Sequence, residues 1–199
     1  MDTRAGNAVG HEHIEVCAAA GIATITMNRP ERRNALSEAH MRELIAALSA
    51  AGDQPDLRAV ILAANGSVFC SGHDFADMID RDLAGMRRLL ATCTELMLTI
   101  RHLPQPVVAK VQGLATAAGC QLVASCDLAV AAEEASFATP GGKGGWFCHT
   151  PMVAVARGLG RSCGGCQARA RTGVDRRCHR RPHRPRLGVR EPRCAAYRA

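Results

Sequence analysis

Alternation of apolar and polar residues dominates the start of the chain. Residues 14–18 and 22–27 alternate with a period of two on either side of Gly21, which predicts an antiparallel β-hairpin. Apolar residues then recur at helical spacing over 41–48, and Ser37 stands where a cap would stabilise the start of that helix. We therefore expect a β-hairpin followed by a helix with one apolar face.

Strands and helices alternate in the pattern that follows. Apolar runs predict short strands at 59–63, 107–111, 128–132 and 136–138, and the first is wholly apolar, as expected when both faces are covered. A long helix is predicted by apolar residues at helical spacing: Leu83, Met86, Leu90, Cys93, Met97 and Ile100. Shorter helices are expected from about residue 116 and over 152–159. This order of elements predicts an α/β fold of repeated β-β-α units.

Charge divides the chain into a core and a tail. The formal net charge is +7, but residues 1–161 hold 14 basic and 16 acidic residues, while residues 162–199 hold 11 Arg and 2 acidic residues. The tail also lacks Ile, Phe, Met and Trp, so it cannot bury enough apolar surface to offset its chain entropy. We expect an N-terminal extension over 1–12, a core over 13–161, and an Arg/Cys/Pro-rich tail that is disordered or read in a wrong frame. A genuine basic interaction arm is the alternative.

Composition restricts the compartment and the class of partner. Aromatic residues make up 3% of the chain, too few for a surface on which single-stranded nucleic acid stacks. We find no apolar run of membrane-spanning length and no transit peptide, so we expect a cytoplasmic protein, or a mitochondrial one if the source is eukaryotic. Cys17, Cys93, Cys120 and Cys126 stand among apolar neighbours, and we expect them to be buried and reduced.

The tail contains one pattern with metal-ligand spacing. Cys163, Cys166, His179 and His183 match the spacing of a two-cysteine, two-histidine zinc finger. However, Pro182 interrupts the segment that should form a helix, and the aromatic residue and the leucine that such a fold needs are not found between the ligand pairs. We therefore expect no metal site, although an Arg-rich tail could bind nucleic acid nonspecifically.

Two turns of small residues carry the candidate chemistry. The first spans 69–75 (FCSGHDF) and the second 112–122 (QGLATAAGCQL), and each leads from an apolar strand into a helix. Such a turn presents unpaired backbone N–H groups at the positive end of a helix, where they can bind an oxyanion. The sequence thus predicts an oxyanion-binding site.

These turns belong to a set of segments that resembles the crotonase family, the enoyl-CoA hydratase/isomerase superfamily. The matching segments, in order, are 27–30 (MNRP) with 34–36 (NAL), 69–74, 106–113 (PVVAKVQG), 118–122 with 126–127, and 135–140 (ASFATP). Within the family, 121–127 and 136–141 are most similar to the enoyl-CoA hydratase domain-containing protein 3 group. The resemblance covers about residues 13–161 and implies a crotonase-like spiral of β-β-α units.

The resemblance implies an acyl-CoA-binding site of fatty-acid metabolism. The backbone N–H groups of His73 and Ala118 would polarise the thioester carbonyl and stabilise an enolate-like anion. The residues expected to contact the substrate are His73, Asp74, Phe75, Ala76 and Ala118, with Arg32 and Arg33 near the CoA phosphates. CoA would be part of the substrate, so no separate cofactor is expected.

The chain departs from the family at both general acid–base positions. The two glutamates of a hydratase would stand at Gln121 and Gly141, but neither an amide nor a glycine can exchange a proton with the water that adds. We therefore expect an acyl-CoA-binding protein with weak or no hydratase activity. Two alternatives remain open: an active hydratase or isomerase with His149 as its base, or a non-catalytic or truncated regulatory module.

Family members assemble as homotrimers or hexamers through a C-terminal helical region. In this chain that region is missing or replaced by the Arg-rich tail, which has no apolar periodicity. We expect an exposed apolar surface on the core, and the resemblance leaves open whether the chain assembles. The expected partner is an acyl-CoA thioester rather than a membrane or a nucleic acid.

Overall fold

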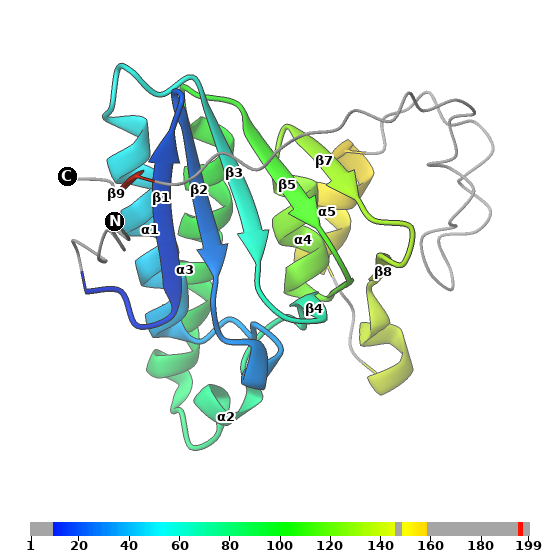
Figure 1. Ribbon diagram of the computed structural model, residues 1–199. Helices are drawn as coiled ribbons and strands as arrows, with labels where there is room; N and C mark the ends of the chain where they lie inside the picture. Colours follow the sequence, from blue (N-terminus) through cyan, green and yellow to red (C-terminus); the bar gives the residue numbers. More distant parts are fainter. Residues whose placement is uncertain (1–9, 146–148, 159–194, 197–199) are drawn as a thin grey trace.

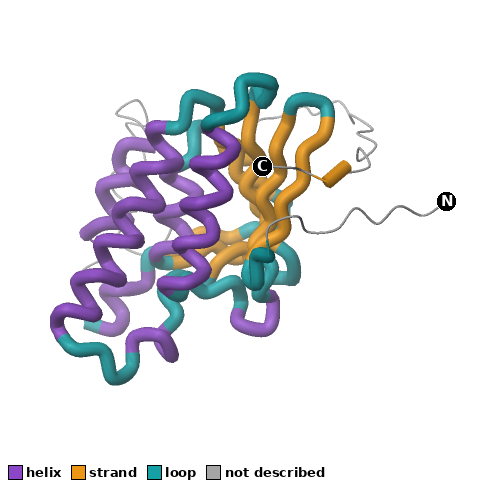
Figure 2. The backbone as a smooth tube through the Cα atoms, turned by 90° about the vertical axis from the view of Figure 1, so that its left-hand side faces the viewer, coloured by secondary structure: helices purple, strands orange, loops and turns teal. Residues whose placement is uncertain are grey.

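A computed structural model describes residues 10–145, 149–158 and 195–196 of the 199-residue chain. A six-stranded sheet forms one layer, and the helices gather against one face of it (Figures 1 and 2). A second sheet of three short strands lies near one end of the larger sheet (Figure 1).

The larger sheet has the strand order β7-β5-β3-β2-β1-β9. Its strands are β1 (Ile14–Ala19), β2 (Ile22–Met27), β3 (Ala59–Ala64), β5 (Val107–Val111), β7 (Leu128–Ala131) and β9 (Ala195–Ala196). β1 and β2 form the predicted antiparallel hairpin, whereas β2, β3, β5 and β7 run parallel to one another. The smaller sheet is parallel, in the order β4 (Val68–Cys70), β6 (Leu114–Thr116), β8 (Ser136–Ala138).

The predicted β-β-α repeat is confirmed, and it explains the two sheets. Each of the pairs β3–β4, β5–β6 and β7–β8 gives its first strand to the larger sheet and its second to the smaller one. The helices are η1 (Pro30–Arg32), α1 (Glu38–Gly52), α2 (Phe75–Met78), α3 (Leu83–His102), α4 (Ala118–Ser125), η2 (Pro140–Gly144) and α5 (His149–Gly158). The repeat therefore places the three ends of β4, β6 and β8 next to one another, each at the start of a helical segment.

The main core lies between the larger sheet and the helices α1 and α3. Ser37 caps α1 as predicted, because its Oγ accepts a hydrogen bond from the His40 N–H at 3.2 Å. The prediction that the apolar strand at 59–63 is covered on both faces is wrong in part. Val60 and Leu62 are fully buried against the helices, but Ile61 on the other face is only half-buried.

The predicted apolar face of α3 is also wrong in part. Leu83 and Leu90 are 68% and 50% exposed, while Leu89 and Leu96 are fully buried. Both stripes satisfy helical spacing, and packing against α1 selects the one that includes Leu89 and Leu96. Cys93, Met97 and Ile100 belong to both stripes and are buried as expected.

Several apolar side chains of the core are exposed, and the predicted apolar surface left by a missing C-terminal helical region stays a prediction. Leu128 and Val130 of β7 are 63% and 59% exposed, and Val153 of α5 is 52% exposed. In the described residues, no helix combines the length and apolar character needed to cross a membrane.

Most of the predicted tail lies outside the described residues, and so do the four residues of the zinc-like pattern. Ala195 and Ala196 are described, and they pair antiparallel with Ala18 and Cys17 of β1. Cys93 and Cys120 are buried as expected, whereas Cys17 is disulfide-bonded, contrary to the expectation of a reduced thiol. The division of the chain into extension, core and tail stays a prediction.

Candidate functional site

The carboxyl ends of the three short strands meet at one edge of the smaller sheet. Residues 71–73 follow β4, Ala117 and Ala118 follow β6, and residues 139–141 follow β8. These segments lie side by side because the three strands are parallel neighbours with β6 in the centre, and the Ala117 N–H donates to the carbonyl of Ala138 at 2.9 Å. Carboxyl ends of parallel strands are common ligand-binding positions.

Hydrogen bonds fix the direction of the His73 amide. Leu36 N–H donates to the Gly72 carbonyl at 2.8 Å, and Asp74 N–H donates to the Leu36 carbonyl at 3.1 Å. The peptide that joins Gly72 to His73 is trans, so its N–H points opposite to its C=O. The His73 N–H therefore points away from Leu36, and it has no hydrogen-bond partner among the described residues.

The Ala118 amide is the first of helix α4. The Ala117 carbonyl accepts the first helical hydrogen bond, from Gln121 N–H at 3.1 Å, so the Ala118 N–H points out of the N-terminal end of the helix. No side chain caps this end. Ala117 itself has φ 51° and ψ −122°, a conformation that glycine adopts far more readily than alanine. Backbone strain of this kind is concentrated at functional sites.

Two glycines bring these turns into contact. Gly72 has φ +96°, and a Cβ built on it would lie 3.0 Å from the Ala117 Cβ and 3.4 Å from the Ala118 nitrogen. A Cβ on Gly119 would overlap the carbonyl oxygen of Cys70, the last residue of β4. The absence of side chains at both positions lets the turn after β4 approach the start of α4 closely.

Gln121 and Gly141 lie at the same edge of the smaller sheet. Gln121 is on the first turn of α4 and is 9% exposed, and its side-chain amide makes no hydrogen bond to the described residues. Gly141 is in η2, directly after β8. His149, the alternative base, is the first residue of α5, and its side chain lies outside what the structure describes.

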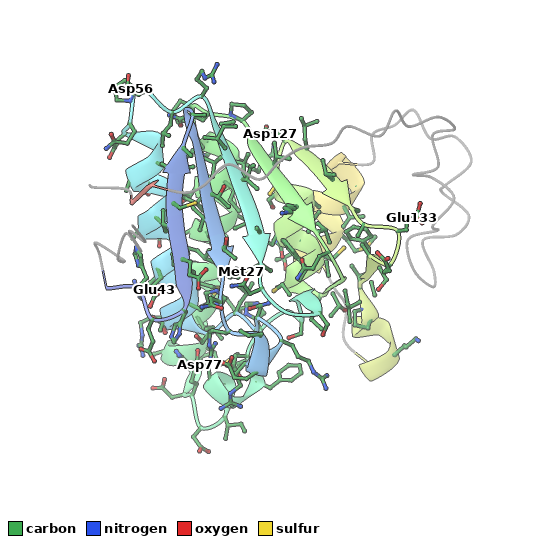
Figure 3. The ribbon with its side chains drawn as sticks, viewed as in Figure 1. Met27, Glu43, Asp56, Asp77, Asp127 and Glu133 are labelled. Carbon is green, nitrogen blue, oxygen red and sulfur yellow. The ribbon has the colours of Figure 1, made fainter. Side chains whose placement is uncertain are left out.

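Three of the residues expected to contact substrate lie at the start of helix α2: Asp74 as its cap, then Phe75 and Ala76. The Asp74 carboxylate is buried, and its Oδ1 accepts the Ala76 N–H at 3.1 Å as the cap of α2. Phe75 is 72% exposed. The Asp77 Oδ2 accepts the N–H of Glu38 at the start of α1 at 2.7 Å. Figure 3 shows Asp77 below Met27, at the end of the molecule toward which β2 runs.

Arg32 and Arg33 lie on an exposed loop next to the first turn. The Arg33 carbonyl accepts the Ser71 N–H at 3.1 Å, which places the loop backbone beside that turn. Neither guanidinium forms an ion pair within the described part of the chain. Both are therefore accessible to an anionic ligand.

The His73 imidazole has an environment of its own. Its Nδ1 is buried without a hydrogen-bond partner in the described residues. Burial lowers the pKa of His73, opposed in part by the Leu36 backbone and by Asp77. The imidazole is therefore neutral near pH 7. The candidate oxyanion contact uses the backbone N–H of His73 and not its imidazole.

Comparison with known proteins identifies the family. The family model for enoyl-CoA hydratase/isomerase matches residues 18–169. This chain belongs to the enoyl-CoA hydratase/isomerase family. It is 49% identical over 138 residues to the mitochondrial enoyl-CoA hydratase domain-containing protein 3 of Danio rerio. The alignment covers 69% of this chain and 48% of the relative. It is 47% identical over 144 residues to the protein of the same name in Homo sapiens, with 71% of this chain and 47% of the relative covered.

Solved structures of family members have the same fold. An enoyl-CoA hydratase from Mycobacterium smegmatis aligns with a TM-score of 0.70 and 47% identity, covering 73% of this chain and 57% of that one. Human enoyl-CoA hydratase domain-containing protein 3 aligns with a TM-score of 0.71 and 44% identity, covering 73% and 58%. The predicted crotonase-like fold is thus confirmed for the core. The chain spans about half the length of the curated relatives it matches.

Sequence reasoning missed two residues whose side chains connect the loops around the candidate site. Asn34 is fully buried, and its side chain accepts the Arg29 N–H and donates to the carbonyls of Asn65 and Val68. The Arg29 side chain contacts Asp74 across a gap of 45 positions. Both residues stand in the family segment at 27–36, but nothing in one sequence shows which distant group each contacts.

Proposed function

We propose that this chain binds an acyl-CoA thioester and holds the thioester carbonyl oxygen between the His73 and Ala118 amide hydrogens. The observation that carries the proposal is the pair of N–H groups at adjacent strand ends, each with a fixed direction and no acceptor among the described residues. A ligand oxygen placed between them would accept a hydrogen bond from each, and one such bond contributes about 1 kcal/mol. Family membership supports acyl-CoA as the ligand, with CoA entering as part of the substrate.

We propose further that hydratase activity is very low or nil. Water addition needs one group that accepts a proton and one that donates it. At the two positions where the family resemblance implies glutamates, this chain has Gln121 and Gly141. One oxyanion donor contributes about 3 kcal/mol to transition-state stabilisation, which does not replace proton transfer. The expected outcome is a bound, polarised thioester that is hydrated slowly or not at all.

Calorimetry with crotonyl-CoA tests the binding step. The unmodified chain is expected to bind, and Gly72→Ala to bind at least about tenfold more weakly, because the new methyl group fills the space beside the Ala118 nitrogen. Gly10→Ala is the matched control, since a Cβ there meets no atom within 4 Å. No heat of binding with the unmodified chain would contradict the proposal and favour a non-catalytic, non-binding module.

Loss of enoyl absorbance on hydration of crotonyl-CoA tests the second step. A rate within about tenfold of a family hydratase that carries both glutamates would contradict the proposed loss of activity. In that case His149→Ala decides whether His149 acts as the base: turnover that survives the substitution excludes it.

A further inference from the structure

Arg29 connects two loops that are far apart in the sequence. It follows β2, and its side chain is 13% exposed. One guanidinium nitrogen, Nη1, donates to the Ala35 carbonyl at 3.0 Å and to the Ser37 Oγ at 3.2 Å. The other, Nη2, donates to Asp74 Oδ2 at 3.3 Å. A single planar group therefore contacts the loop before α1 and the turn after β4.

Asp74 is held from two sides by this arrangement. Its Oδ1 caps α2 through the Ala76 N–H, and its Oδ2 accepts from Arg29. The carboxylate is buried, so it depends on these partners to offset the loss of hydration. Its position fixes the backbone of the residue that directly follows His73.

Leu36 and His73 form an isolated parallel β-bridge, which orients the His73 amide. The residues that Arg29 contacts lie next to these two residues in the sequence. Ala35 and Ser37 are the neighbours of Leu36, and Asp74 is the neighbour of His73. Three backbone hydrogen bonds join the two loops in the described structure: Leu36 N–H donates to the Gly72 carbonyl, Asp74 N–H to the Leu36 carbonyl, and Ser71 N–H to the Arg33 carbonyl. The Arg29 side chain adds a charged contact that spans the bridge and keeps both loops in register.

We propose that Arg29 is a positioning residue for the His73 amide. It acts through Ala35, Ser37 and Asp74 rather than by contact with a ligand, and it keeps the Gly72–His73 peptide in the orientation described above. The inference rests on the proposed function, in which the His73 N–H binds the thioester oxygen. Removal of the guanidinium is expected to let that peptide rotate, so that a bound thioester is polarised less.

A second ion-pair cluster in the same region provides the matched control. Arg81 pairs with Glu38 at 2.7 Å and with Asp77 at 2.9 Å, and this cluster joins α2 to the start of α1. Its carboxylates form no hydrogen bond with Leu36, Gly72 or His73 in the described structure, although the lowering of the His73 pKa by burial is opposed in part by the nearby Asp77. Arg81→Met therefore removes an arginine and two ion pairs close to α2 without removing a contact to either side of the bridge.

Amide hydrogen exchange in the ligand-free protein tests the inference directly. Arg29→Met is expected to lower protection of the Leu36 N–H about tenfold, because its bond to Gly72 loses the support of a charged hydrogen-bond network. The Val60 N–H, bonded to Pro106 in the larger sheet, should keep its protection, and so should Leu36 in Arg81→Met. Unchanged Leu36 protection in Arg29→Met, or an equal loss at Leu36 and Val60, would overturn the inference.

If Arg29→Met does not fold, the same hydrogen-exchange measurement on Asp74→Asn tests whether the Arg29–Asp74 contact orients the His73 N–H. The amide keeps an acceptor for the Ala76 N–H and removes the negative charge that pairs with Arg29. The same local loss at Leu36, with Val60 unchanged, supports the inference, and its absence overturns it.

The infrared frequency of a bound acyl-CoA carbonyl gives the second readout. In Arg29→Met the frequency is expected to move toward that of the free thioester, whereas in Arg81→Met it should equal that of the unmodified chain. If the unmodified chain binds no acyl-CoA, the proposed function fails while the exchange data still decide the role of Arg29. If it binds and polarises the carbonyl and Arg29→Met does so equally, the positioning role alone fails.

Discussion

Ala117 has the least favourable backbone conformation at the candidate site. A residue with a side chain at φ 51°, ψ −122° stores strain of about 1–3 kcal/mol, yet this conformation lets the chain turn from β6 directly into α4. We predict that Ala117→Gly raises the free energy of unfolding by about 1 kcal/mol, since relief of strain exceeds the added entropy of the unfolded chain. Urea denaturation measures the change.

Ala124→Gly is the control for this prediction. It lies within α4, where glycine is expected to lower the free energy of unfolding by about 1 kcal/mol. If Ala117→Gly and Ala124→Gly lower the free energy of unfolding by the same amount, Ala117 does not have the strained backbone assigned to it.

His40 is a buried histidine outside the candidate site. Its side chain lies in the core, with Nδ1 3.1 Å from the Ala35 carbonyl and Nε2 without a partner among the described residues. Burial lowers the pKa of His40 from 6.5 to about 4. Between pH 6.5 and pH 4 the unfolded chain therefore binds a proton at His40 that the folded chain does not. The contribution of neutral His40 to the free energy of unfolding is fully present above pH 6.5 and is lost as the pH falls toward 4.

We predict that His40 accounts for about 3 kcal/mol of lost stability between pH 6.5 and pH 4. The measurement is the free energy of unfolding against pH for the unmodified chain and for His40→Asn, in which the slope should be reduced. His102→Asn, at the exposed end of α3, is the control, because it makes the same replacement on the surface. Equal slopes in all three proteins would contradict the assignment.

At the scale of elements, the loop between β2 and α1 is held together by Asn34. Its side chain makes three hydrogen bonds, to Arg29 N–H and to the carbonyls of Asn65 and Val68, and its φ is 50°. We predict that Asn34→Gly lowers the free energy of unfolding by about 3 kcal/mol, because buried polar groups of three segments lose their partners. Glycine keeps the left-handed backbone but adds conformational entropy to the unfolded chain, which the control substitution measures separately.

Thermal or urea denaturation checks this value. The exposed loop residue Arg33 also has a positive φ of 53°, and Arg33→Gly serves as the control because its side chain makes no ion pair in the described structure. A loss at Asn34 no larger than the change at Arg33 would show that its hydrogen bonds contribute little.

Elements with a long, regular pattern could be predicted from the sequence, and so could the short strands β7 and β8, which the sequence predicts at 128–132 and 136–138. The β1–β2 hairpin and α1 have periodic patterns over many residues, and their predicted positions are correct. The exact bounds of β4, β6 and α2 could not be predicted, because each spans only three or four residues and shows no recognisable period. The face of α3 was misjudged at Leu83 and Leu90, because spacing alone cannot distinguish two overlapping stripes.

At the scale of the whole molecule, the candidate site depends on contacts that no local pattern encodes. The family resemblance predicts His73 and Ala118 as site residues, and the fold explains why their turns meet: the β-β-α repeat makes β4 and β6 parallel neighbours. The role of Gly119 follows only from the three-dimensional approach of α4 to Cys70. The Arg29–Asp74 contact likewise requires the folded arrangement of two loops.

The infrared spectrum of a bound acyl-CoA, labelled with ¹³C at the thioester carbonyl, tests the central claim most directly. Two amide hydrogens that donate to the carbonyl oxygen weaken the C=O bond, so we predict a lower stretching frequency in the complex than in free acyl-CoA. Gly72→Ala should abolish this shift, and Gly10→Ala should retain it. A complex that forms with an unshifted carbonyl frequency would contradict the claim that the His73 and Ala118 amides bind the thioester oxygen.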